Sequence, residues 1–238
     1  MSSPLTFVLV HGGFHGGWCW RDVATRLRSR GHAVFTPTQT GCGERSHLLS
    51  KDITLDTFVD DIANVLIWED LADVVLVGHS FGGIAVTGVA DRMPERIRRL
   101  VYLDAAILEN GQSMFGMLDP QVVAGRKAAA EASGGAGIPP PAPALFGIRD
   151  PAQAAFVAAH LTAHPLGAYT SSLNLAHPIA NGVPAVYIEC TEPVYAGLQF
   201  ARDWVAANGM ESVTLATAHD AMITAPGPLA ELLERLGA

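Results

Sequence analysis

The chain has 238 residues and a formal net charge of −8 at pH 7, and 49% of its residues are hydrophobic. Its Lys and Arg residues form no run, which argues against nucleic acid or an anionic membrane as the main partner and leaves small-molecule chemistry or a protein partner. The length suits one α/β domain with a large buried core, so we expect a single domain over residues 1–238.

The start of the chain carries no recognisable targeting signal. Residues 1–4 lack a basic segment, and the apolar run over residues 5–10 is only as long as a strand. We therefore expect neither a signal peptide nor a membrane anchor, and we expect a cytoplasmic protein. The sequence leaves a homodimer open.

Strand-like and helix-like segments alternate in the first half of the chain. Short apolar runs favour buried strands, and apolar residues at helical spacing favour amphipathic helices. The predicted elements, in order, are strand 5–10, helix 20–27, strand 32–35, helix 53–66, strand 74–77, a helix after Ser80, and strand 100–103, which ends at Asp104. This alternation predicts an α/β fold with a mostly parallel sheet and helices on both faces.

The regular alternation stops over residues 105–181. Ala-rich helical pieces at 127–132 and 152–161 are separated by Gly134-Gly135-Ala136-Gly137 and by three prolines at 139–141. So long an insertion is typical of a lid over a site, and its apolar residues exceed what a free linker would carry. We predict a lid with a mobile Gly/Pro stretch, followed by strands 183–190 and 212–217 and a last helix over 229–236.

A serine lies at the sharpest turn that the sequence predicts. Gly78-His79-Ser80-Phe81-Gly82 fits the G-x-S-x-G nucleophile elbow, with an apolar strand before it and small residues after it. The glycines allow a strained turn and close packing of the next helix on the strand. Ser80 is therefore the candidate nucleophile.

A serine hydroxyl needs a base and oxyanion donors before it can attack a carbonyl. His219 lies in the loop after the last predicted strand, where the base belongs in the order serine, acid, histidine. The backbone N–H of Phe81 and one N–H from the Gly12-Gly13 loop are the candidate oxyanion donors.

Neither the cysteines nor the histidines indicate a metal or a cofactor. Cys19, Cys42 and Cys190 are far apart and form no C-x-x-C pair, so we expect buried thiols in a reducing compartment. His11 and His15 have i,i+4 spacing but lie in a glycine-rich loop without a metal-binding motif. We expect no metal site and no cofactor.

Several motifs occur together in this sequence, and their spacing is as informative as the motifs themselves. They are Phe7-Val8-Leu9-Val10-His11-Gly12-Gly13, His15-Gly16-Gly17-Trp18 with Trp20, Gly78-His79-Ser80, His164-Pro165-Leu166-Gly167, Cys190-Thr191-Glu192 and His219. With them the chain resembles the α/β-hydrolase superfamily. More narrowly, it resembles the methylesterase and hydroxynitrile lyase group, which includes the plant methyl salicylate esterase and bacterial esterases. The resemblance implies an α/β-hydrolase fold and an oxyanion hole made by the N–H groups of Gly13 and Phe81.

The resemblance also separates two chemistries. The lyases of the group carry a Thr at the position of Gly12 and a Lys directly after the catalytic histidine, where this chain has Asp220. Those groups hold the cyanohydrin hydroxyl and the departing cyanide. Their absence implies hydrolysis rather than cyanohydrin cleavage.

The third member of a catalytic triad is not assigned by the resemblance. The esterases of the group have an Asp where this chain has Pro193. Asp104, at the end of strand 100–103, is our first candidate for the acid, because other branches of the superfamily take the acid from just after that strand. Glu192 is the second candidate, and Glu109 and Asp220 remain as further ones.

Taken together, the residues predict a serine hydrolase of the carboxylesterase type. It would cleave an ester or related acyl bond, including a lactone or thioester, through an acyl-Ser80 intermediate. The apolar residues of the predicted lid favour a small apolar or aromatic ester as substrate. Two alternatives remain: a lyase that uses Ser80 and His219, and a small-molecule receptor without turnover.

Overall fold

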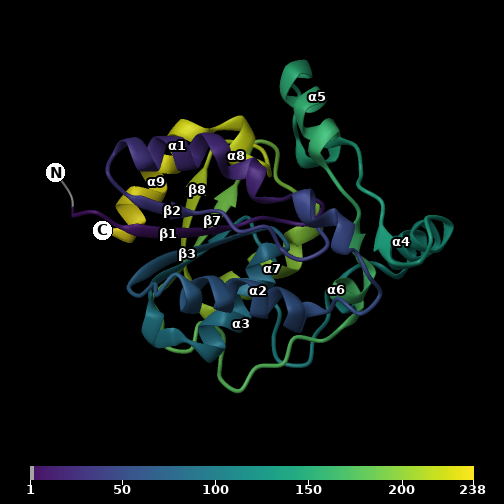
Figure 1. Ribbon diagram of the computed structural model, residues 1–238, viewed down its shortest axis with the longest axis horizontal. Coiled ribbons are helices and arrows are strands. Elements are labelled where there is room, and N and C mark those ends of the chain that lie inside the picture. The colour runs from purple at the N-terminus through teal and green to yellow at the C-terminus, as the bar shows by residue number, and fades with distance from the viewer. Residues whose placement is uncertain (1–2) are drawn as a thin grey trace.

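A computed structural model describes residues 3–238. Met1 and Ser2, which belong to the segment where we expect no signal peptide, lie outside the described residues. A six-stranded parallel sheet forms the centre, in the order β2-β1-β3-β4-β7-β8 (Figure 1). Its strands are β1 (Thr6–Val10), β2 (Ala33–Phe35), β3 (Val74–His79), β4 (Ile97–Leu103), β7 (Ala185–Cys190) and β8 (Glu211–Leu215). The predicted α/β class with a parallel sheet is confirmed.

Helices cover both faces of the sheet. Helices α1, α8 and α9 lie on one face, and α2 and α3 lie on the other (Figure 1). The helices are α1 (Arg21–Ser29), α2 (Leu55–Trp68), α3 (Gly82–Arg92), α4 (Pro120–Ala132), α5 (Pro151–His160), α6 (Leu166–Thr170), α7 (Gln199–Asn208), α8 (Ala221–Thr224) and α9 (Pro226–Gly237). Within residues 3–238, no helix combines the length and apolar character that crossing a bilayer requires.

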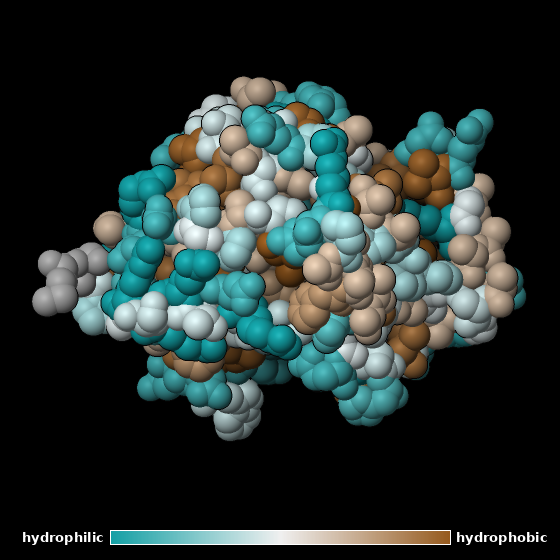
Figure 2. Space-filling model, turned by 90° about the horizontal axis from the view of Figure 1, so that it is seen from above, coloured by the Kyte–Doolittle hydropathy of each residue, from teal (hydrophilic) through white to brown (hydrophobic). Residues whose placement is uncertain are grey.

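Side chains along each strand alternate between the two faces of the sheet, so the core consists of two apolar clusters. In β1, Phe7 and Leu9 pack under α1 and α9, while Val8 and Val10 pack under α2 and α3. Successive side chains of a strand point to opposite faces, so a strand that is apolar throughout needs cover on both sides. The outer face that carries α1 is largely hydrophilic, with only scattered hydrophobic patches (Figure 2).

Residues 105–181 leave the sheet after β4 and return to it before β7. They hold α4, α5, α6 and a small antiparallel pair, β5 (Gly137–Ile138) and β6 (His164–Pro165). The segment's helices α4, α5 and α6 lie at the end of the molecule toward which the parallel strands run (Figure 1). Its placement matches a cover for the carboxyl edge of the sheet, and its role as a lid stays a prediction.

Several boundaries differ from those predicted. Helix α4 begins at Pro120 rather than at 127, because Asp119 caps it by accepting a hydrogen bond from Gln121 N–H at 2.7 Å and proline suits the first helical turn. Helix α7 was not predicted, although Phe200, Ala201, Trp204 and Val205 recur at helical spacing and pack against the core.

Candidate active site

The turn after β3 holds Ser80 in an unusual backbone conformation. Ser80 has φ = 51°, a left-handed value that costs a non-glycine residue about 1–3 kcal/mol. A side chain on Gly78 would stand 2.6 Å from Val86 Cγ2, and one on Gly82 would stand 2.5 Å from the carbonyl oxygen of His11. Both glycines are therefore required for the close packing that presents Ser80 at the end of β3.

Ser80, His219 and Asp104 form one hydrogen-bonded chain. His219 Nε2 lies 2.9 Å from Ser80 Oγ, and His219 Nδ1 lies 2.6 Å from Asp104 Oδ2. A carboxylate only accepts, so Nδ1 donates to Asp104 and leaves Nε2 free to accept the Ser80 hydroxyl proton. The arrangement can therefore activate Ser80 as a nucleophile.

Backbone contacts at the sheet edge hold Asp104 in place. Asp104 follows β4, has φ = 38°, and donates its N–H to the carbonyl of Ile188 in the neighbouring strand β7 at 2.7 Å. Its carboxylate is fully buried, and Arg202 Nη1 lies 3.7 Å from its second oxygen. This arginine of α7 partly balances the buried negative charge. No motif or spacing in the sequence indicates this role of Arg202.

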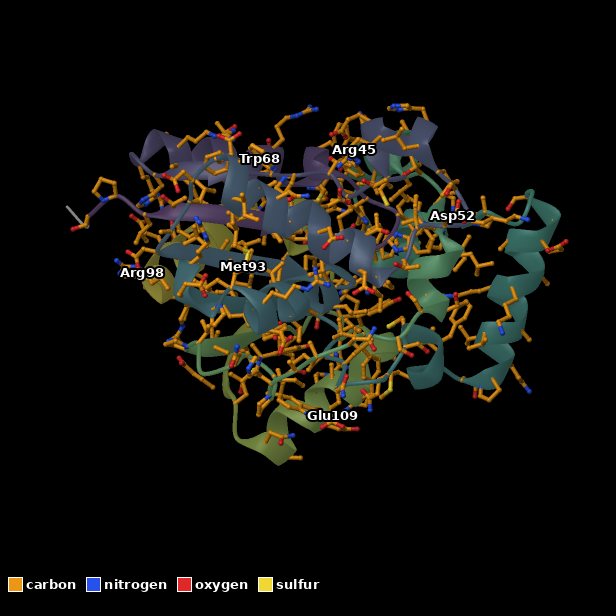
Figure 3. All side chains as sticks on the ribbon, turned by 60° about the horizontal axis from the view of Figure 1, so that its bottom comes forward. Arg45, Asp52, Trp68, Met93, Arg98 and Glu109 are labelled. Carbon is orange, nitrogen blue, oxygen red and sulfur yellow. The ribbon has the colours of Figure 1, made fainter. Side chains whose placement is uncertain are left out.

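Within the described residues, none of the other three acid candidates forms a hydrogen bond with the His219 ring. Glu192 is exposed, and Glu109 lies at the surface beside α7, where it accepts a hydrogen bond from Trp204 Nε1 at 3.0 Å (Figure 3). Asp220 is buried and pairs with His15 at 3.0 Å. Of the four predicted carboxylates, Asp104 is the one that the structure places against the imidazole.

Gly13 and Phe81 carry the two backbone N–H groups that are predicted to donate to the oxyanion. Gly13 and Phe81 both line the pocket that contains Ser80, and within residues 3–238 neither N–H donates a hydrogen bond. Such free donors are what an oxyanion hole requires. The role of Gly13 and Phe81 as oxyanion donors stays a prediction.

His11 fixes the peptide that carries the Gly13 N–H. Burial lowers the pKa of His11 to about 4, so the ring is neutral. Its Nδ1 lies 2.8 Å from the Gly12 carbonyl oxygen, while its Nε2 accepts the Gln39 N–H at 3.0 Å. Because the Gly12 carbonyl and the Gly13 N–H belong to one peptide unit, this bond orients the donor.

His79 supports the loop that carries the base. Its Nε2 lies 3.0 Å from the carbonyl oxygen of His219, and burial holds its pKa well below the ordinary value. The neutral His79 ring therefore donates this hydrogen bond to the His219 carbonyl oxygen. His79, His219 and Asp220 lie close enough to offer three ligand atoms to a metal ion. Both His219 nitrogens are engaged by Ser80 and Asp104, so a metal there would disrupt that chain.

A pocket of about 660 Å³ opens onto Ser80 and His219. Its wall is mostly apolar and comes from the insertion and from residues 193–200. Representative lining residues are Met114, Met117, Leu118, Phe146, Leu198 and Phe200. The volume suits a small organic molecule rather than a polymer.

A strained serine, a histidine and a buried carboxylate in this chain order, at the carboxyl edge of a parallel sheet, are typical of serine hydrolases of the α/β type. Residues 7–232 match the sequence model of the alpha/beta hydrolase family, and the chain belongs to that family. The predicted α/β-hydrolase fold is thereby confirmed.

Two named relatives show which members of the family are similar to this chain. The chain is 40% identical to the carbendazim hydrolyzing esterase of Nocardioides sp. (strain SG-4G), over 97% of this chain and 99% of that protein. It is 37% identical to putative methylesterase 11, chloroplastic, of Arabidopsis thaliana, over 47% of this chain and 29% of that protein.

A solved structure extends the similarity to the whole fold. An extracellular alpha/beta-hydrolase from a Paenibacillus species, described as sharing structural and functional homology with tobacco salicylic acid binding protein 2, matches with a TM-score of 0.86. Its identity is 28%, over 98% of this chain and 99% of that chain. The predicted resemblance to the methylesterase group is confirmed.

Proposed function

We propose that this protein is a serine esterase in which Ser80, His219 and Asp104 form the catalytic triad. The observation that carries the proposal is the continuous chain from Asp104 through His219 to the Ser80 hydroxyl. The expected ester hydrolysis is confirmed at the level of the family and of relatives that are named esterases. The residue roles are our proposal.

Ser80 attacks the ester carbonyl carbon while His219 Nε2 takes the hydroxyl proton. The Gly13 and Phe81 N–H groups stabilise the negative oxygen of the tetrahedral intermediate. His219 then returns the proton to the departing alcohol, which leaves the acyl group on Ser80. Water, deprotonated by His219, attacks the acyl carbon, and Ser80 recovers its proton as the acid product leaves. Asp104 holds the imidazole in the required tautomer throughout.

The pocket supports a small apolar or aromatic ester as substrate. Its walls are rich in methionine, leucine and phenylalanine, and burial of an aromatic or aliphatic group against them favours binding. The lyase alternative is not favoured, because Gly12 offers no hydroxyl and Asp220 is engaged by His15. A cytoplasmic location and a homodimer stay predictions.

A fluorophosphonate probe tests the nucleophile. We expect the wild type to be labelled on Ser80 and to hydrolyse p-nitrophenyl esters, whereas Ser80→Ala should be neither labelled nor active. Ser29→Ala, which removes an exposed hydroxyl on α1, is the matched control. Absence of labelling in the folded wild type would overturn the proposal.

A further inference from the structure

Arg126 faces the pocket from helix α4. It lines the same pocket as Ser80 and His219, and its guanidinium carbon lies 5.0 Å from the centre of the Tyr169 ring. Its Nη1 is buried and has no hydrogen-bond partner within residues 3–238. A buried guanidinium N–H without an acceptor costs free energy, which a ligand oxygen would recover.

Among residues 3–238, no carboxylate forms an ion pair with Arg126. Asp119 is the one carboxylate among the described pocket-lining residues, and it caps α4 through Gln121 N–H at 2.7 Å. Burial raises the pKa of Tyr169 to about 12, even though Arg126 acts to lower it, so the phenol stays neutral. Burial raises the pKa of Tyr195 as well. In the part of the chain that the structure describes, Arg126 therefore has no counter-ion.

Tyr169 lies close to Arg126 and also to the residues around Ser80. Its ring centre lies 4.8 Å from that of Phe81, and its hydroxyl lies 3.3 Å from the point where a side chain on Gly13 would begin. Tyr169 thus lies near the two oxyanion donors and also contacts Arg126. A ligand whose carbonyl oxygen meets Gly13 and Phe81 would share the pocket with Arg126.

We propose that Arg126 binds a carboxylate of the substrate, so that the preferred substrate is an aromatic ester with a second, anionic group. The proposal rests on the esterase function above and names its substrate class. A planar guanidinium binds a carboxylate through two parallel hydrogen bonds, and the apolar surroundings strengthen the attraction. A substrate of this kind would be held at both ends, with its ester at Ser80 and its acid at α4.

Two esters of matched shape test the proposal. Monomethyl terephthalate carries a carboxylate opposite the ester, and methyl 4-carbamoylbenzoate carries a neutral amide there. We expect the wild type to favour the carboxylate in kcat/KM, and Arg126→Gln to lower the ratio of the two values by about 10- to 100-fold. Arg126→Lys keeps the positive charge but cannot form the two parallel hydrogen bonds, so it should give an intermediate ratio. Lys127→Gln, which removes the next cation on the same helix, should leave the ratio unchanged.

A binding measurement separates this proposal from the esterase function. Ser80→Ala protein cannot turn the esters over, so calorimetry gives their affinities directly. Here Arg126→Gln should weaken binding of monomethyl terephthalate by at least about tenfold more than it weakens binding of the amide. Equal losses for both ligands, or no loss for either, would mean that Arg126 only packs on Tyr169, and would overturn the proposal. Turnover of p-nitrophenyl esters, which carry no carboxylate, reports on the esterase function whatever the outcome for Arg126.

Discussion

His15 Nε2 and Asp220 Oδ2 lie 3.0 Å apart in a fully buried pair that links residues 205 positions apart. The second ring nitrogen of His15 lies 2.8 Å from the Gly13 carbonyl oxygen. Both neighbours are acceptors, so both ring nitrogens donate and His15 is an imidazolium. Burial lowers the pKa of His15, but the charge and hydrogen bond of Asp220 outweigh it and raise the pKa above 6.5. The pair ties the loop of His219 to the oxyanion loop.

Asp220→Asn should destabilise the protein by about 3–5 kcal/mol near pH 6, because it leaves His15 without its buried counter-ion. The pH dependence follows from both partners. The raised pKa of His15 means that its stabilising contribution is complete below 6.5 and declines as pH rises through the folded value. Although burial raises the pKa of Asp220, His15 lowers it overall, so the carboxylate contributes above 3.8 and less as pH falls through its folded value.

Urea unfolding of wild type and Asp220→Asn from about pH 6 to pH 9 measures this effect. The two unfolding free energies should converge as His15 loses its proton. Asp73→Asn, which removes one partner of the exposed pair with Arg98, is the control and should leave the pH slope unchanged. Parallel pH profiles for wild type and Asp220→Asn would contradict a charged His15.

Asp104→Asn should lower kcat by about 10³–10⁴ while the fold is retained, because the amide favours the wrong imidazole tautomer and stabilises no imidazolium. Glu192→Gln is the matched control: it makes the same chemical change at an exposed site without contact to His219 and should stay near wild type. Hydrolysis of p-nitrophenyl esters gives both rates. Similar activity of the two variants would remove Asp104 from the proposed triad.

The sequence identified Ser80 and His219 as candidates because each carries a local signal. Ser80 lies in a five-residue motif between a buried strand and small residues, and His219 follows the last strand. The sheet was predictable for a similar reason, since short apolar runs bounded by polar turns require burial on both sides. These features depend on neighbours in the chain.

The acid and the substrate-facing residues depend instead on tertiary contacts. Asp104 was one of four carboxylates that the sequence left as candidates for the acid. Its position against His219 is determined by the pairing of β4 with β3 and β7. Nothing near Arg126 or Arg202 in the sequence distinguishes them from solvated cations. Their importance follows from which buried groups they meet: the pocket for Arg126 and Asp104 for Arg202.

The three cysteines should be unreactive in the native protein. Cys19, Cys42 and Cys190 are free and buried, and burial raises the pKa of each thiol. Thiol reagents attack the thiolate, so both access and ionisation are suppressed. Ellman's reagent should report no thiol at neutral pH in the folded state and 3 after unfolding in guanidinium. Rapid reaction of any thiol before unfolding would contradict this burial.

Gly12→Ala should impair catalysis more than stability. The added methyl group would stand 2.7 Å from Ser80 Cβ and 2.9 Å from His79 Nδ1, closer than such atoms can approach. Either Ser80 or the Gly12-Gly13 peptide must therefore shift, and a displacement approaching 1 Å costs about 10²-fold in rate. Gly125→Ala is the control, because its methyl group meets no atom within 4 Å and alanine favours the interior of α4. The control should keep full activity and gain about 0.5–1 kcal/mol of stability. Fluorophosphonate labelling at the wild-type rate in Gly12→Ala would show that the elbow tolerates the methyl group, and that the oxyanion loop is not packed against Ser80 as described.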